Sequence, residues 1–278
     1  MTTRKFDQTL ELFNDGKLSL FFIGCGSAFS KTFFQSNILV VKGNDHLLID
    51  CGTLCPYVLK TVYNSHVKNI KNLLITHPHA DHVGGVEEMA LVAFYTNKNK
   101  INMVITDDFK KKLWNQTLRG GIQYSELGKM TFNDYFSQIK PVKIQSKPFD
   151  MYSVSIGEIK FKMFRTRHVT TSRKSLRGSQ LSYGILFEDR ILFTGDTQFN
   201  PSQLEWFDRN YKLDCIFHDC DIKGFATGVH SSYEQLKTLP AELKAKMYLY
   251  HYNNEIKSVT PKEDGFAGIV NSGFYYDF

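Results

Sequence analysis

Thr76-His77-Pro78-His79-Ala80-Asp81-His82 is the stretch of sequence that decides the fold. It directly follows the apolar residues 73–75, where a short buried strand is expected to end. Pro78 disfavours a regular helix, so we expect the stretch to form a tight loop. A loop can direct alternate side chains to two neighbouring points, and imidazole and carboxylate groups are ligands of Zn²⁺. Three histidines and an aspartate at this spacing therefore predict a metal centre for two ions.

Short apolar runs and helical patterns alternate on both sides of this loop. No linker, internal repeat or low-complexity tract interrupts them, so we expect one domain over residues 1–278. Hairpins mixed with helices in this order predict an α+β fold, in which two sheets carry helices on their outer faces. The strands are expected at 18–23, 38–41, 47–49, 73–76, 103–105, 151–154, 159–164, 182–187, 190–194, 215–218 and 247–250, and the helices at 53–63, 86–95 and 231–239.

The composition is that of a globular, water-soluble protein. The 278 residues are 42% hydrophobic, 22% charged and 14% aromatic, which excludes a disordered chain. No apolar run approaches the ~20 residues of a transmembrane helix, and the N-terminus lacks the apolar core of a signal peptide. Five scattered cysteines indicate reduced thiols and a cytoplasmic location. The net charge of +6 favours phosphate-bearing ligands only weakly, since a solvated surface gives the same value.

Three later strands are each followed by a candidate ligand. His168 follows the expected strand 159–164, Asp196 lies in Phe193-Thr194-Gly195-Asp196-Thr197, and His251 ends the strand 247–250. A lone histidine is more often a core or surface residue than a ligand. The order and spacing of these residues relative to the histidine-rich loop favour the ligand interpretation.

With these residues in place, the sequence resembles the metallo-β-lactamase superfamily of zinc hydrolases from Leu18 to Asn253. The resemblance implies the αβ/βα four-layer sandwich of that superfamily. It also implies two Zn²⁺ ions, with Mn²⁺ as an alternative, and a ligand set in which Asp196 bridges both ions. The first ion would take His77, His79 and His168, and the second would take Asp81, His82 and His251. Two carboxylates against two dications leave the site electropositive, so it would attract anions.

Three further motifs resemble the ribonuclease Z branch of this superfamily: Gly24-Cys25-Gly26-Ser27-Ala28, Phe217-His218-Asp219 and His230-Ser231-Ser232. By this resemblance, Asp81, His230 and Asp219 take part in catalysis, with His230 as a proton donor and Asp219 as its acidic partner. Hydrolysis of a phosphodiester needs such a donor, because the departing alkoxide must be protonated. An acidic neighbour keeps the imidazole charged. Asp221 could take the role of Asp219, and a surface histidine at a helix start is the alternative for His230.

The chain also departs from ribonuclease Z. No stretch resembles the long Gly- and Lys-rich arm that grips transfer RNA. A basic stretch around His168 could bind phosphate or form a solvated loop; it contains Arg165, Arg167, Arg173, Lys174 and Arg177. The missing arm suggests a small phosphodiester, and residues 228–240 and 247–252 resemble the anti-Pycsar group of phage and bacterial phosphodiesterases that open cyclic nucleotides.

The expected activity is therefore hydrolysis of 3′,5′-cyclic nucleotides to the 5′-monophosphate by a dizinc enzyme, which could serve to evade a cyclic-nucleotide antiviral defence. A ribonuclease Z that trims transfer-RNA 3′ ends is the main alternative. Two further alternatives exist. A lactonase or thioesterase would not need His230 as an acid. A non-catalytic nucleotide sensor would retain the metal ions only for structural stability.

Two predictions concern aromatic residues. Phe29, Phe33 and Phe34 follow the Gly24–Ser27 turn, where core packing is the more frequent fate of phenylalanine and base stacking the alternative. Ribonuclease-Z-like proteins commonly pair, and the aromatic tail 273–278 would be unfavourable in water. We therefore expect a homodimer that binds a small cyclic nucleotide and no membrane.

Overall fold

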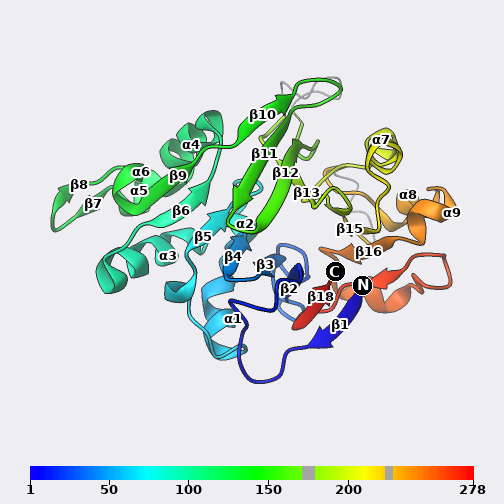
Figure 1. The fold of residues 1–278 in the computed structure, drawn as a ribbon, viewed down its shortest axis with the longest axis horizontal. Coiled ribbons are helices and arrows are strands. Elements are labelled where there is room, and N and C mark those ends of the chain that lie inside the picture. The colour runs from blue at the N-terminus through cyan, green and yellow to red at the C-terminus, as the bar shows by residue number, and fades with distance from the viewer. Residues whose placement is uncertain (171–178, 223–227) are drawn as a thin grey trace.

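The computed structural model describes residues 1–170, 179–222 and 228–278. Two mixed β-sheets face each other, and helices cover their outer sides (Figure 1). The first sheet contains, in spatial order, β1 (Thr2–Lys5), β18 (Phe274–Asp277), β2 (Ser19–Gly24), β3 (Asn37–Lys42), β4 (Asp45–Ile49), β5 (Asn72–Leu74), β6 (Ile101–Val104) and β9 (Phe136–Ile139).

The second sheet is built from the C-terminal half of the chain. Its spatial order is β10 (Val142–Gln145), β11 (Met151–Ile156), β12 (Ile159–Arg165), β13 (Tyr183–Phe187), β14 (Ile191–Phe193), β15 (Cys215–Asp219), β16 (Met247–Tyr250) and β17 (Gly268–Ile269).

Apolar side chains hold the two sheets together. The central strands β2, β13 and β15 are buried along their whole length, as expected for strands covered on both faces. Phe22 of β2 lies 5.1 Å from Phe217 of β15, measured between ring centroids, so the sheets meet directly at this point. The two predicted hairpins are present: Ile38 pairs with Ile49, and Ile185 pairs with Phe193.

The helices form the outer layers. In Figure 1, α1, α3 and α4 lie beside the first sheet, and α7, α8 and α9 lie beside the second. The α+β four-layer arrangement expected from the sequence is thus confirmed. The helices are α1 (Cys55–Thr61), α2 (Ala80–Val83), α3 (Val86–Val92), α4 (Asp107–Leu113), α5 (Arg119–Ile122), α6 (Phe132–Tyr135), α7 (Pro201–Tyr211), α8 (Tyr233–Lys237) and α9 (Ala241–Lys244).

The aromatic C-terminal tail is buried inside the protein. The expectation that it would be exposed to water without a partner subunit was therefore wrong. Strand β18 returns to the first sheet and pairs with β1 on one side and β2 on the other (Figure 1). Tyr275 and Tyr276 are therefore covered by their own chain. The expectation of a homodimer loses this support and stays a prediction that rests on the resemblance alone.

A small hairpin, β7 (Tyr124–Ser125) with β8 (Gly128–Lys129), extends from the body of the molecule (Figure 1). Its apolar side chains Tyr124 and Leu127 are exposed. Across residues 1–170, 179–222 and 228–278, none of the helices combines the length and the apolar character that crossing a bilayer requires.

Candidate metal centre

The predicted ligands come together because the strands that precede them run in the same direction. Strands β4, β5 and β6 are parallel, and so are β14, β15 and β16. Strand β13 is antiparallel to both β12 and β14, so β12 and β14 run in the same direction. Within each sheet the carboxyl ends of these strands therefore lie at one edge, and the contacts of His168 with His79 and of His251 with Asp81 join the two edges. Open sheets in α/β proteins also bind their ligands at this end of their strands.

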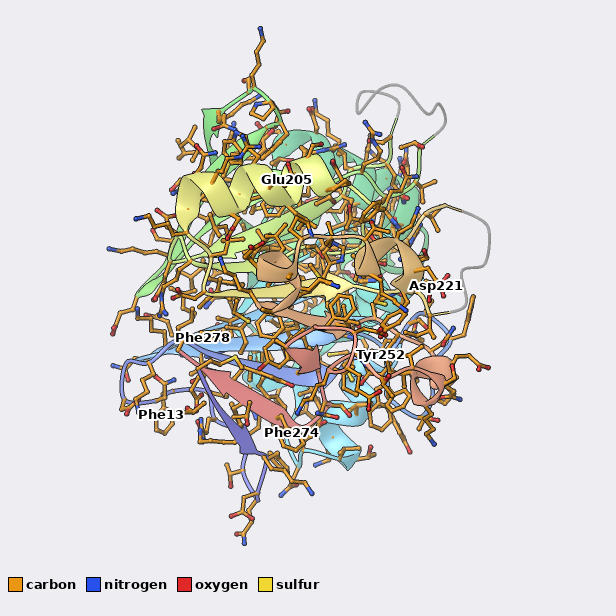
Figure 2. The ribbon with its side chains drawn as sticks, turned by 90° about the vertical axis from the view of Figure 1, so that its right-hand side faces the viewer. Phe13, Glu205, Asp221, Tyr252, Phe274 and Phe278 are labelled. Carbon is orange, nitrogen blue, oxygen red and sulfur yellow. The ribbon has the colours of Figure 1, made fainter. Side chains whose placement is uncertain are left out.

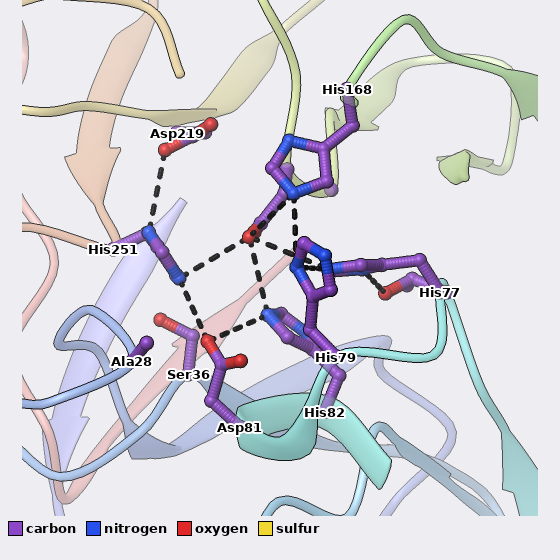
Figure 3. A network of polar contacts seen from close by, with 12 residues as sticks. Ala28, Ser36, His77, His79, Asp81, His82, His168, Asp219 and His251 are labelled. Carbon is purple, nitrogen blue, oxygen red and sulfur yellow. Dashed lines mark hydrogen bonds and ion pairs between the residues drawn. The ribbon is translucent and has the colours of Figure 1, made fainter. Parts of the chain in front are cut away.

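The first group of predicted ligands consists of three imidazoles, His77, His79 and His168 (Figure 3). The Nδ1 atom of His79 lies 3.0 Å from Nε2 of His77 and 3.2 Å from Nε2 of His168. His77 and His168 are fully buried and His79 is partly exposed. The three nitrogens thus converge on one point at the edge of the site, as ligands of a single ion do.

The second group consists of Asp81, His82 and His251, which Figure 3 labels, and it also includes Asp196. The Oδ2 atom of Asp81 lies 3.2 Å from Nε2 of His82 and 3.3 Å from Nε2 of His251. All four residues are buried. Two carboxylates and two imidazoles are a donor set that suits Zn²⁺, and Mn²⁺ takes the same donors.

Asp196 lies between the two groups. Its Oδ2 atom is 3.3 Å from the Nε2 atoms of His82 and His251, 3.7 Å from Nε2 of His77 and 3.9 Å from Nε2 of His168. Neither carboxylate oxygen of Asp196 has a hydrogen-bond partner, and Nε2 of His82 also lacks one, although these atoms are fully buried. Buried polar groups without partners are costly, and two cations would satisfy all of them. The residues therefore fit a pair of divalent ions.

The histidine-rich stretch is less loop-like than its sequence indicates. Residues 77–79 are extended, but Asp81 and His82 lie on the one-turn helix α2, so the expectation of a loop throughout was wrong. Pro78 precedes this helix and does not disturb it. The helical turn places Asp81 and His82 next to each other at the second group, while the extended part carries His77 and His79 to the first.

Hydrogen bonds from protein groups orient several of these imidazoles. Nδ1 of His168 donates to the carbonyl of Val229 at 2.8 Å, and Nδ1 of His82 donates to Oδ2 of Asp50 at 2.7 Å. These contacts select the tautomer in which Nε2 carries the lone pair and faces the cluster. Burial also lowers the pKa of His77 and of His168, the latter to about 4, so both rings are neutral ligands at neutral pH.

Asp50 is a residue of the site that the sequence analysis missed. It follows β4, adopts a left-handed backbone conformation (φ 64°) and is buried. Its Oδ1 accepts from the backbone N–H of Thr76 and its Oδ2 from the Thr76 hydroxyl, both at 2.7 Å. The same hydroxyl lies 3.1 Å from Nδ1 of His77. Asp50 thereby connects His77 of the first group with His82 of the second, and its position after an apolar strand was the available signal.

His230 and Asp219 form a pair beside the cluster. Nδ1 of His230 lies 2.8 Å from Oδ2 of Asp219, and Oδ1 of Asp219 lies 3.5 Å from Nδ1 of His251. Burial opposes a charge on His230, but the negative Asp219 raises the pKa of His230 above its usual value. Burial would likewise raise the pKa of Asp219, but His230 lowers it to about 2. Each group of the pair therefore favours the charged form of the other.

His230 is also close enough to the cluster to be a ligand itself. Its Nδ1 lies 4.0 Å from Oδ2 of Asp196, and it forms candidate groups with His168 and Asp196 or with Asp219 and His251. His230 precedes Ser232, which caps helix α8, and its side chain is 23% exposed, unlike the buried ligands. The alternative residue Asp221 bonds through its backbone to Ser231 and Tyr233.

Two members of the predicted basic stretch lie among the described residues. Arg165 is buried, donates to Oγ of Ser179 at 3.1 Å and lies over the ring of Tyr183, so its charge supports the fold. Arg167 is partly exposed next to His168. The other members, Arg173, Lys174 and Arg177, lie outside the described residues.

Comparison with solved structures identifies the fold. The metallo-β-lactamase fold protein YhfI from Bacillus subtilis superposes with a TM-score of 0.65 at 15% identity, over 94% of this chain and all of that one. The short form of human tRNase Z superposes with a TM-score of 0.60 at 17% identity, over 93% of this chain and 98% of that one. The chain has the metallo-β-lactamase fold, as the resemblance implied.

Comparison of sequences identifies the family. A profile described as "Anti-Pycsar protein Apyc1" matches residues 18–276. Anti-Pycsar protein Apyc1 of Paenibacillus sp. (strain J14) is 33% identical over 87% of this chain and 91% of its own length. That of Bacillus phage vB_BsuM-Goe3 is 32% identical over 86% and 91%. With its cluster of histidines and aspartates, the protein is a metal-dependent hydrolase, and the chain belongs to the anti-Pycsar Apyc1 family.

Proposed function

We propose that the protein is a phosphodiesterase with two metal ions, most simply Zn²⁺, that hydrolyses 3′,5′-cyclic nucleotides to 5′-monophosphates. Membership of the anti-Pycsar family supports a role in degrading cyclic nucleotides. The observation that carries the chemical part of the proposal is the shared Oδ2 atom of Asp196, which lies within 4 Å of ligand nitrogens in both groups. A carboxylate in this position suits a pair of adjacent cations.

In this proposal, His77, His79 and His168 hold one ion, Asp81, His82 and His251 hold the other, and Asp196 contacts both. Two divalent cations in these places would supply Lewis acidity, which lowers the pKa of water and stabilises negative charge on the phosphoryl oxygens. The protein orients three of these ligands: Asp50 contacts His82, Val229 contacts His168 and Asp219 contacts His251. Asp81 thus serves catalysis as a ligand, because its carboxylate is turned toward His82 and His251.

His230 is proposed as the general acid. Opening a 3′,5′-cyclic phosphate to the 5′-monophosphate leaves a charged 3′ oxygen, which must be protonated. A protonated imidazole paired with a carboxylate can supply this proton, and the contact with Asp219 raises the pKa of His230 and so favours that form. The partial exposure of His230 leaves it accessible to a substrate bound at the cluster. Asp219 is thus a positioning residue, which also lies next to His251.

Transfer-RNA processing is the second candidate, since the short form of human tRNase Z shares the fold. A likeness at 17% identity shows the fold alone, however. The hairpin β7–β8 has strands of only two residues each, so it is not the long arm that the resemblance associates with transfer RNA. The shape of the described part of the chain therefore favours a small substrate.

A panel of substrates tests the proposal. We expect the protein loaded with Zn²⁺ or Mn²⁺ to hydrolyse at least one 3′,5′-cyclic mononucleotide, and a chelator to abolish this turnover. A precursor transfer RNA and an acyl-lactone should be cleaved much more slowly under the same conditions. His77→Ala is the matched control, because it removes one ligand of the first group and should be inactive on all three. Faster cleavage of the transfer RNA or of the lactone would contradict the proposal.

A further inference from the structure

The loop after β2 exposes an aromatic side chain beside the metal centre. Phe29 is 91% exposed, which makes it the most exposed large apolar side chain in the described part of the chain. The prediction that Phe29 packs into the core was therefore wrong, whereas Phe33 and Phe34 do pack against the core as expected. An exposed phenylalanine loses the hydrophobic stabilisation that burial gives, and it leaves an aromatic face available for contact with another ring.

The loop that carries Phe29 is attached to the metal centre. The backbone N–H of Ser27 donates to the carbonyl of Tyr252 at 3.0 Å, and the N–H of His251 donates to the carbonyl of Cys25 at 2.7 Å. Figure 3 draws Ala28 next to Ser36, on the side of the cluster where His251 and Asp81 lie. Phe29 is the next residue, and consecutive Cα atoms are about 3.8 Å apart. The backbone of Phe29 therefore directly follows a residue at the edge of the site.

The loop is held in one conformation by several contacts. The carbonyl of Ala28 accepts from Nε2 of Gln35 at 3.0 Å, and the N–H of Gly26 donates to the carbonyl of Phe34 at 2.8 Å. A Cβ atom on Gly26 would lie 2.6 Å from that same carbonyl, so only glycine allows this close approach. Phe34 has a φ of 55°, a conformation that bulky residues rarely adopt. Such strained backbone persists where the surrounding structure fixes it, and it clusters at ligand-binding sites.

We propose that Phe29 is the surface on which the base of the substrate stacks. This inference rests on the proposed function, in which the phosphodiester binds at the cluster. In a 3′,5′-cyclic nucleotide only the ribose separates the phosphorus from the base, so a base whose phosphate is at the cluster is within reach of the adjacent loop. Every base has an aromatic face, and stacking on an aromatic side chain removes apolar surface of both rings from water. Purines have the larger ring system and gain most from this contact.

Two variants at Phe29 and a matched control test the inference. Phe29→Ala removes the ring, Phe29→Trp keeps an aromatic face, and Phe13→Ala removes another exposed phenylalanine, which is 71% exposed. Figure 2 shows Phe13 on the opposite side of the view from Tyr252, the residue to which the Phe29 loop is attached. The steady-state KM and kcat are measured with 3′,5′-cyclic adenosine monophosphate and with a ribose 3′,5′-cyclic phosphate that has no base.

Phe29→Ala should raise the KM for the adenine substrate about 5- to 150-fold, the range expected for the loss of one base–aromatic stack, and leave kcat within about twofold. Phe29→Trp should keep the KM close to that of the native protein, and Phe13→Ala should change nothing. For the substrate without a base, Phe29→Ala should have no effect, because no stack exists to be lost. Unchanged thermal melting of Phe29→Ala shows that the fold is intact.

The failures of the two proposals are distinguishable. Native protein that hydrolyses no cyclic nucleotide contradicts the proposed function. Native protein that does so, with the same adenine KM in Phe29→Ala, contradicts only the role of Phe29. A Phe29→Ala variant that changes oligomeric mass in light scattering, or that loses activity equally on both substrates, would show that Phe29 makes a protein contact instead of a base contact.

Discussion

Replacing Asp50 with asparagine should weaken metal binding although Asp50 is not a predicted ligand. Its carboxylate accepts three hydrogen bonds of 2.7 Å: two from Thr76 and one from Nδ1 of His82. An asparagine side chain has the same size, but one of its ends is a donor. If the amide oxygen stays with the N–H of Thr76, the amide nitrogen faces two further donors, the Thr76 hydroxyl and Nδ1 of His82.

The magnitude follows from these contacts. The Thr76 hydroxyl can turn and accept from the amide, but Nδ1–H of His82 loses its acceptor, which lowers the free energy of unfolding by about 1–3 kcal/mol. His82 can relieve this cost by moving its proton to Nε2, which then no longer offers a lone pair to an ion. The loss of one orienting partner typically lowers metal affinity about 10- to 100-fold. We expect at least this decrease for the ion next to His82.

Competition with a chromophoric chelator measures the Zn²⁺ affinity of both sites, and urea unfolding measures stability in parallel. Asp107→Asn is the matched control, since Asp107 is an exposed carboxylate whose bonds go to Lys140 and Gln138 and not to a candidate ligand. Thr76→Val removes only the hydroxyl and should give a smaller decrease than Asp50→Asn. If Asp50→Asn lowers stability but binds two ions as tightly as the native protein, the proposed orienting role of Asp50 is refuted.

Four other predictions can be checked with standard measurements. His230→Ala should lower kcat about 10²- to 10⁴-fold for a cyclic nucleotide and much less for a nitrophenyl phosphodiester, whose leaving group needs no proton. Metal analysis of this variant should still find two ions, and loss of metal would identify His230 as a ligand. Removal of metal with a chelator should lower the melting temperature by about 5–10 °C, and His77→Ala should shrink this shift in differential scanning fluorimetry. Tyr276→Ala should cost about 3–5 kcal/mol in urea unfolding, since its buried ring packs on Phe22 and Phe217, whereas exposed Tyr124→Ala should stay within about 0.5 kcal/mol. We expect a homodimer, so light scattering should give twice the chain mass of 32.1 kDa. A single species of 32.1 kDa would reject this prediction.

The residues gathered at the site could be predicted because their signal is local. His77, His79, Asp81 and His82 lie within six residues, and the later candidates each follow an apolar run that became a strand. The direction of these strands then brings their carboxyl ends together. The ribonuclease Z motifs added His230 and Asp219, which the structure places 2.8 Å apart.

The features that escaped prediction depend on tertiary contacts. Asp50 has no motif around it, and its importance appears only when Thr76 and His82 are seen to share its carboxylate. The aromatic tail seemed exposed because no sequence pattern shows that β18 inserts between β1 and β2. Because phenylalanine is usually a core residue, burial was predicted for Phe29. The hydrogen bonds of its loop hold the side chain outside the core. The extent of a single domain over 1–278 stays a prediction.

The central claim is that the cluster around Asp196 hydrolyses a 3′,5′-cyclic nucleotide with metal ions. Phosphorus NMR of a cyclic nucleotide incubated with the metal-loaded protein tests it most directly, because the resonance identifies the bond that breaks. We expect the cyclic phosphate signal to be replaced by that of the 5′-monophosphate alone, and to persist when a chelator is added or when Asp196→Ala is used. A 3′-monophosphate product, or conversion that continues in Asp196→Ala or with the chelator, would contradict the account.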